Sequence, residues 1–175
     1  MIGQNDGFAA ALESPDDVPP AAFAPCHCGD DELTAAWGRS AERVTEAFAT
    51  SPGERPVLLA EISGERRFPA TTVLGFHLLD TVAHTWDVAT ALGREFRPDD
   101  ELAVLVARQA AAVPAGAARE RPGAAFAPAV ALPAGSDPWT SALAHLGRRG
   151  GRPTRRGPAP SGSPGPWRGP ARCSG

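Results

Sequence analysis

The stretch TTVLGFHLLDTVAHTWDVATAL, residues 71–92, decides the fold. It contains no proline and one internal glycine. Pro69 can open a helix just before it, and Gly93 stands where helices commonly end. At about 100° per residue, one side of this helix is apolar and the other carries a narrow polar stripe. The apolar side comprises Leu78, Leu79, Val82, Trp86 and Ala89.

The polar stripe consists of His77, Asp80, His84 and Asp87, within an arc of about 80°. Asp80 and His84 are four residues apart, so their side chains lie one turn apart. A carboxylate and an imidazole at that spacing can hold one divalent ion such as zinc. The same pair is also a common helix-stabilising contact on a solvated face, and both interpretations stay open.

The rest of the chain predicts further helices. The spacing of apolar residues indicates helices over residues 2–12, about 31–50, about 99–113 and 137–146, the second capped by Asp30 or Asp31. Residues 57–68 suit a small hairpin or an extended connection, and residues 114–138 an irregular loop. We therefore expect an all-α protein, an antiparallel four-helix bundle with the extended segment between its second and third helices.

The segment GFHLLDTVAHTWDVATALG, with RFPATTV before it and ALAHLGR later, resembles actinobacterial metal-binding helical proteins. These are the relatives of mycothiol-dependent maleylpyruvate isomerase, within the wider DinB-like family. The resemblance implies a four-helix bundle with a divalent metal, usually zinc, held by a His on the first helix and by an acidic residue and a His on the third. The last two correspond to Asp80 and His84, with Asp where the isomerase branch has Glu.

The first-helix His has no counterpart here, since no His precedes His27. We expect either that the true start lies further upstream or that this helix and its ligand are absent. Two of the three implied metal ligands are then present. An incomplete first helix would leave apolar faces exposed and would favour a homodimer.

Charge divides the chain into a body and a tail. The formal net charge is −3, all 17 basic residues are Arg, and seven of them lie in residues 148–175, which contain no acid. Residues 1–147 therefore carry ten Arg against 20 acids, a charge of −10, and we expect them to form the helical domain. The Arg-, Gly- and Pro-rich tail, residues 148–175, is expected to be disordered, and we expect residues 149–175 to be a frameshifted or read-through product.

Several classes of protein are excluded or disfavoured. The sequence has no apolar run of 18 residues and no secretory signal, and its body is acidic. We therefore expect a cytoplasmic protein that binds neither membrane nor nucleic acid. Cys26, His27 and Cys28 are all zinc-ligand types, but their spacing is unlike that of a zinc site and no second pair exists.

Three hypotheses for function follow. The resemblance implies a metal-dependent transferase or isomerase that uses a low-molecular-weight thiol, with mycothiol the candidate, on an unidentified small molecule. His77 is then a candidate proton carrier, and the catalytic residues stay unidentified. The alternatives are a non-catalytic metal- or small-molecule-binding module and a truncated product that lacks a complete metal site.

Overall fold

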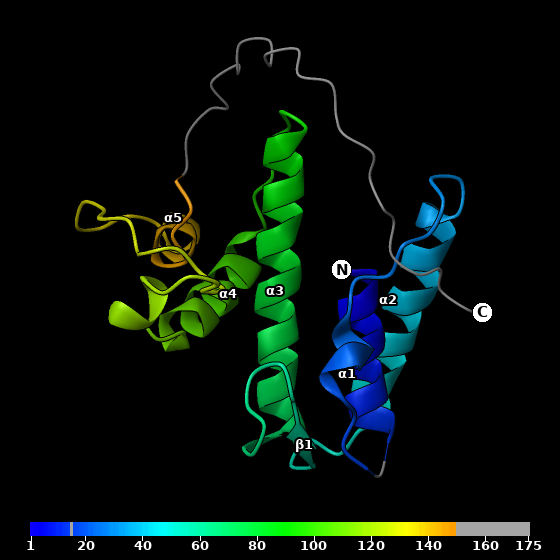
Figure 1. Ribbon diagram of the computed structural model, residues 1–175. Helices are drawn as coiled ribbons and strands as arrows, with labels where there is room; N and C mark the ends of the chain where they lie inside the picture. The colour runs from blue at the N-terminus through cyan, green and yellow to red at the C-terminus, as the bar shows by residue number, and fades with distance from the viewer. Residues whose placement is uncertain (15, 150–175) are drawn as a thin grey trace. The chain divides into compact units, whose positions relative to one another are not determined.

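The computed structural model describes residues 1–14 and 16–149, and these form two compact units, residues 1–77 and residues 78–149. The described chain is mostly helical, with five α-helices and one two-stranded sheet (Figure 1). Its elements are α1 (Ile2–Glu13), η1 (Pro20–Phe23), α2 (Leu33–Thr50), β1 (Pro56–Leu58), β2 (Arg67–Pro69), α3 (Ala70–Ala91), α4 (Asp100–Ala112), η2 (Ala117–Arg119) and α5 (Pro138–His145). The expected tail beyond residue 149 lies outside the described residues.

In the first unit α1 packs against α2 and against the short helix η1 (Figure 1). The contact with η1 is close, because a Cβ atom built on Gly7 would lie only 2.4 Å from the ring of Phe23. Phe8 meets the same ring edge to face, with 5.7 Å between the centroids. The core of this unit gathers buried side chains from α1, η1, α2, the sheet and the start of α3, namely Phe8, Leu12, Phe23, Val44, Val57, Leu59, Phe68 and Val73.

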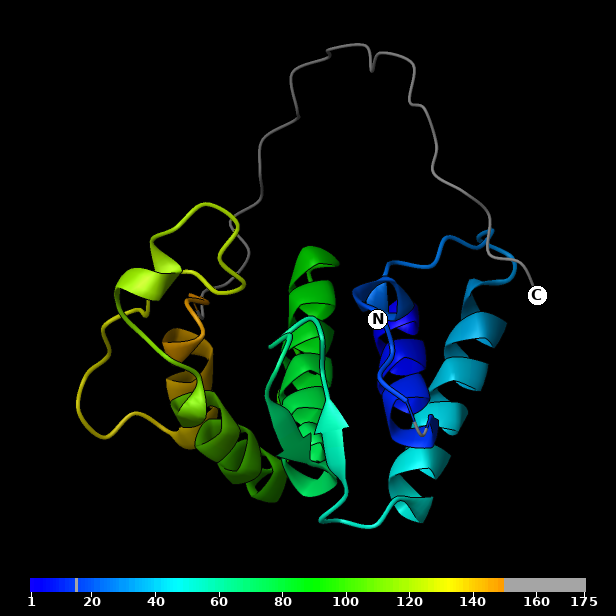
Figure 2. The ribbon, with the colours of Figure 1, turned by 60° about the horizontal axis from the view of Figure 1, so that its bottom comes forward.

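The predicted extended segment is a small antiparallel hairpin of β1 and β2 (Figure 2). Val57 pairs with Phe68 at its centre, and both side chains are buried in the core of the first unit. The Arg55 guanidinium donates to the carbonyls of Leu12 and Ser14. This contact ties the start of the hairpin to the end of α1.

In the second unit α4 and α5 pack against each other (Figure 1). Each helix is capped at its start by an aspartate, one of the residues preferred at the N-cap position. The Asp99 carboxylate accepts from the amide of Leu102 at 2.8 Å, and the Asp137 carboxylate accepts from the amide of Thr140 at 3.2 Å. The buried core of this unit consists of Leu79, Val82, Ala83, Ala103, Val106, Ala110, Trp139, Ala142, Leu143 and Leu146.

Arg119 anchors the long loop between α4 and α5. This arginine is buried, with a relative exposure of 6%. Its guanidinium donates to the carbonyls of Pro114 at 2.7 Å, Val113 at 3.2 Å and Ala127 at 3.4 Å, and to that of His145. One arginine therefore satisfies backbone acceptors at the end of α4, in the loop and at the end of α5.

The long helix α3 runs through the boundary between the two units. Of the predicted apolar side, Leu79 and Val82 are buried in the core of the second unit, and Leu78 and Trp86 pack against it. Val73, which lies on the other side of the helix, is buried in the first unit. Gly93 follows the helix with a φ of 68°, which confirms the predicted helix end.

One predicted cap is wrong. Neither Asp30 nor Asp31 caps α2, since the helix begins at Leu33 and the residue at its N-cap, Glu32, makes no side-chain capping bond. The reason is a turn in which the Glu32 amide donates to the carbonyl of Gly29 at 3.0 Å. Asp30 and Asp31 lie within this turn, before the helix begins.

Within residues 1–14 and 16–149, each helix is too short or too polar to cross a bilayer.

Candidate metal site

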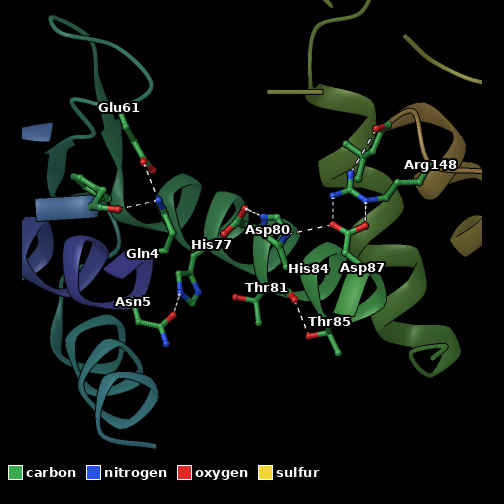
Figure 3. A network of polar contacts seen from close by, with 12 residues as sticks. Gln4, Asn5, Glu61, His77, Asp80, Thr81, His84, Thr85, Asp87 and Arg148 are labelled. Carbon is green, nitrogen blue, oxygen red and sulfur yellow. Dashed lines mark hydrogen bonds and ion pairs between the residues drawn. The ribbon is translucent and has the colours of Figure 1, made fainter. Parts of the chain in front are cut away.

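Asp80, His84 and Asp87 form a connected polar group on one side of α3 (Figure 3). The His84 Nε2 atom lies 3.2 Å from Asp80 Oδ1, and its Nδ1 atom lies 3.2 Å from Asp87 Oδ2. The spacings of four and three residues bring these side chains together on the helix surface, as the sequence predicts. The imidazole of His84 is therefore held between two carboxylates.

Arg148 adds a fourth side chain to this group through Asp87. Its Nε and NH2 atoms donate to the two oxygens of Asp87 at 2.8 and 2.6 Å, a two-pronged ion pair (Figure 3). The Arg148 side chain is only 17% exposed, so solvent screens the pair less than at an open surface. Arg148 thus fixes Asp87, and Asp87 in turn holds the ring of His84.

Local backbone geometry explains how Arg148 reaches α3. α5 ends in a turn in which Gly147 has a φ of 77°, a conformation that glycine adopts without strain. The amide of Arg148 then bonds back to the carbonyl of Leu143 at 2.8 Å. Sequence reasoning missed this residue because it assigned Arg148 to the tail. The glycine that follows the last apolar turn was the available signal.

The carboxylates around His84 raise its pKa above the ordinary value. The hydrogen bond that the ring donates to Asp80 is the largest cause of the raised pKa, partial burial opposes it, and the charges of Asp80 and Asp87 add to the rise. Partial burial pushes the pKa of Asp87 upward, but the hydrogen bond and charge of Arg148, with those of His84, outweigh it, so this pKa is lowered. Without a metal the group therefore favours an imidazolium between two carboxylates.

This shift predicts how stability depends on pH. Because the pKa of folded His84 lies above its unfolded value of about 6.5, its contribution to the free energy of unfolding is complete below that pH and is lost as the pH rises through the folded pKa. We expect the metal-free protein to lose stability above about pH 6.5, and His84→Gln to lose less over the same range. Urea unfolding in the presence of a chelator measures both slopes, and equal slopes would contradict the assignment.

The donor types at Asp80 and His84 fit a divalent metal, and one observation favours it. Asp80 Oδ2 is buried without a hydrogen-bond partner within the described residues, so one carboxylate oxygen has a lone pair to offer. The set is incomplete, however. In residues 1–14 and 16–149, no three or more His, Cys, Asp or Glu side chains are grouped so as to hold a metal ion.

His77, the fourth residue of the predicted stripe, is engaged in the first unit. Its Nε2 atom lies 3.0 Å from Asn5 Oδ1, and its ring packs against Phe8 and Phe48 at centroid distances of 5.0 and 5.6 Å. The amide of Asn5 donates to Ser40 Oγ at 3.0 Å. This second polar group, centred on a side chain that is 2% exposed, was not predicted from sequence. Asn5 stands between Gln4 and Asp6 in α1, so nothing in the local sequence marked it as the buried one of the three.

The Cys26, His27 and Cys28 cluster lies in the loop between η1 and α2, outside any helix or strand. Cys28 carries a free thiol.

The fold and the site define a mostly helical protein whose longest helix presents an aspartate and a histidine one turn apart. Residues 3–89 match the family model of the mycothiol maleylpyruvate isomerase N-terminal domain, so the chain belongs to this family through its first unit and most of α3. The family predicted from GFHLLDTVAHTWDVATALG is thereby confirmed. Searches of curated proteins and of solved structures returned no match.

Proposed function

We propose that this protein binds a divalent metal, with zinc the first candidate, through Asp80 and His84. The observation that carries the proposal is the pairing of Asp80 Oδ1 with His84 Nε2 at 3.2 Å while Asp80 Oδ2 is buried without a partner in the described chain. A carboxylate oxygen and an imidazole nitrogen are both metal-ligand types. An ion between Asp80 and His84 would replace the proton that Asp80 Oδ1 and His84 Nε2 share. The remaining coordination positions would be taken by water or by a small-molecule thiol.

Asp87 and Arg148 are the positioning residues of the proposed site. A metal-binding histidine commonly donates its other ring N–H to a carboxylate, which fixes the tautomer and aims the free nitrogen at the ion. Asp87 Oδ2 lies 3.2 Å from His84 Nδ1 and is itself held by Arg148 at 2.6 Å. This arrangement leaves Nε2 of His84 as the ligand atom.

The reaction class rests on the family. A domain of the mycothiol maleylpyruvate isomerase N-terminal type suggests a thiol-dependent transferase or isomerase, with mycothiol as the candidate thiol and an unidentified small-molecule substrate. When bound, the metal would lower the pKa of a coordinated thiol or water. The same proposal includes three further points. The chain folds as an antiparallel four-helix bundle, it is located in the cytoplasm, and His77 acts as a proton carrier.

A non-catalytic module is the second candidate. It is favoured by the lack of a three-ligand group within the part of the chain that the structure describes. Turnover of a small-molecule electrophile, measured with and without a low-molecular-weight thiol on the zinc-loaded protein, separates the two candidates. Thiol-dependent turnover that is lost in Asp80→Ala supports the enzyme, whereas zinc binding without turnover supports the module.

The metal site itself is tested by zinc titration. We expect Asp80→Ala and His84→Ala each to abolish the binding seen with the unchanged protein, because each removes one of two protein ligands. Asp100→Ala, at a 98% exposed side chain, and His27→Ala are the matched controls and should bind as before. Binding that survives both site variants would refute the proposed site, and binding that is lost in His27→Ala would move it to the cysteine loop.

Asp87→Asn gives a graded prediction. The variant keeps the shape of the side chain but removes the charge that holds His84 and pairs with Arg148. Removal of such an orienting partner typically weakens metal affinity by about 10- to 100-fold. Calorimetric titration with zinc measures the change, and an unchanged affinity would show that Asp87 only stabilises the helix surface.

A further inference from the structure

The end of α5 is held by the loop between α4 and α5, residues 113–137, which we call the α4–α5 loop. The last carbonyls of a helix have no partner within the helix, and here the loop supplies donors to two of them. The carbonyl of His145 accepts from the guanidinium of Arg119. The carbonyl of Ala144 accepts from the amide of Val130 at 2.8 Å. All of these contacts lie within the second unit.

Gly147, two residues past the end of α5, lies directly against the same loop. A Cβ atom built on it would be 2.7 Å from both the Cβ atom and the carbonyl oxygen of Ala127, which is closer than such atoms approach in folded proteins. Its φ of 77° lies in the left-handed region that glycine adopts without strain. The chain can therefore turn against the loop here only because position 147 has no side chain.

This turn determines where the side chain of Arg148 begins. The amide of Gly147 donates to the carbonyl of Ala144 at 3.0 Å. The amide of Arg148 donates to the carbonyl of Leu143 at 2.8 Å, and the two hydrogen bonds together are the pattern of a helix end closed by glycine. From this turn the guanidinium reaches both oxygens of Asp87 (Figure 3). The loop thus holds the turn from which the ion pair is made.

The support of the loop favours the ion pair through entropy. Arg148 is the third residue past the end of α5, where helical order normally falls off. Fixing its backbone in advance removes part of the conformational entropy that the side chain would otherwise lose on pairing with Asp87. Displacing the turn should therefore weaken the pair even though both charged groups are still present.

We propose that the α4–α5 loop positions the candidate metal site. By holding the end of α5, the loop fixes Arg148 against Asp87, whose carboxylate also lies 3.2 Å from the ring of His84. Gly147 and Arg119 are then positioning residues that act through Arg148. The relation to a metal rests on the proposed function, whereas the placement of Arg148 by the loop does not.

The ion pair can be followed without a metal in a proton–nitrogen NMR spectrum of the arginine Nε–H groups of the full chain. The Nε–H of Arg148 donates to a carboxylate, so we expect its signal downfield of those of solvated arginines, and Arg148→Ala assigns it. Gly147→Ala should return this signal to the solvated position, because the added methyl group meets Ala127. Gly135→Ala is the matched control. Gly135 lies in the same loop with a φ of 81°, but its Cβ position is open.

Arg119→Lys tests the same pair through a second contact of the loop. Lysine keeps the charge but cannot donate to several carbonyls at once, so we expect the Arg148 signal to move part of the way. Circular dichroism verifies that each variant is folded, and Arg119→Lys decides the question if Gly147→Ala does not fold. An Arg148 signal that stays in place in a folded loop variant, or that moves equally in Gly135→Ala, would overturn the proposal.

Zinc titration measures what this positioning does to metal binding. Gly147→Ala and Arg148→Ala should weaken the affinity by the same factor, within the range of about 10- to 100-fold that is typical when an orienting partner is lost. The double variant should lose no more than either single variant, because both act on one contact. Losses that multiply would overturn the proposed route through Arg148. If the unchanged protein binds no zinc, the proposed function fails, and the NMR spectrum alone decides whether the loop places Arg148.

Discussion

Replacing Arg119 by alanine is expected to lower the free energy of unfolding by about 3 kcal/mol. The guanidinium bonds to the carbonyls of Val113, Pro114, Ala127 and His145 and is almost fully buried. Alanine would remove the donor from these carbonyls, of which that of Val113 keeps the His145 Nε2 atom at 2.9 Å, and would open a void between α4, α5 and the loop. Urea unfolding followed by circular dichroism measures the change.

Two variants sharpen this result. Arg119→Lys keeps the charge but cannot reach several carbonyls at once, so we expect it to recover only part of the loss. Arg121→Ala, at an exposed position two residues further along the same loop, should change the free energy of unfolding by less than about 0.5 kcal/mol. Equal losses for Arg119→Ala and Arg121→Ala would show that the loop, and not the buried guanidinium, matters.

Replacing Asn5 by alanine is expected to lower the free energy of unfolding by about 2 to 4 kcal/mol. Asn5 is 2% exposed and joins α1 to α2 through Ser40 Oγ and to α3 through His77 Nε2. Alanine removes both hydrogen bonds and a buried side chain, and the hydroxyl of Ser40, which is 4% exposed, then has no water to replace the Asn5 amide. Thermal or urea unfolding of the variant checks this value.

Ser40→Ala provides the matched comparison for Asn5. It removes the acceptor for the Asn5 amide and also the bond that the same hydroxyl donates to the carbonyl of Trp37 within α2. We expect a loss of about 1 to 2 kcal/mol, smaller than for Asn5, because the contact with His77 is kept. The double variant should lose less than the sum of the two, because both changes remove the same contact. Strictly additive losses would contradict the hydrogen-bonded group.

Local pattern was enough to predict most elements of the fold. The helices around Asp99 and Asp137 have an aspartate cap at the start, and α3 ends at Gly93, so their bounds follow from residue chemistry alone. The start of α2 could not be predicted in this way. Asp30 and Asp31 were both candidate N-caps, but they lie in a turn that is closed by the hydrogen bond from the Glu32 amide to the carbonyl of Gly29.

The candidate site was predictable only where its members share a helix. The contacts of His84 with Asp80 and Asp87 follow from spacings of four and three. The pairing of Asp87 with Arg148 joins residues 61 apart in sequence, and that of His77 with Asn5 joins residues 72 apart. Tertiary packing determines such contacts, and no periodicity in the sequence reports them.

The central claim is that His84 is the histidine ligand of a divalent metal. Its most direct test is a long-range proton–nitrogen NMR spectrum of the imidazole rings, recorded before and after zinc is added to the full chain. The sequence has four histidines, so single substitutions assign every signal. We predict that zinc shifts the Nε2 signal of His84 and leaves its Nδ1 proton in place. A spectrum in which His84 does not respond, or in which His27 responds instead, would contradict the claim.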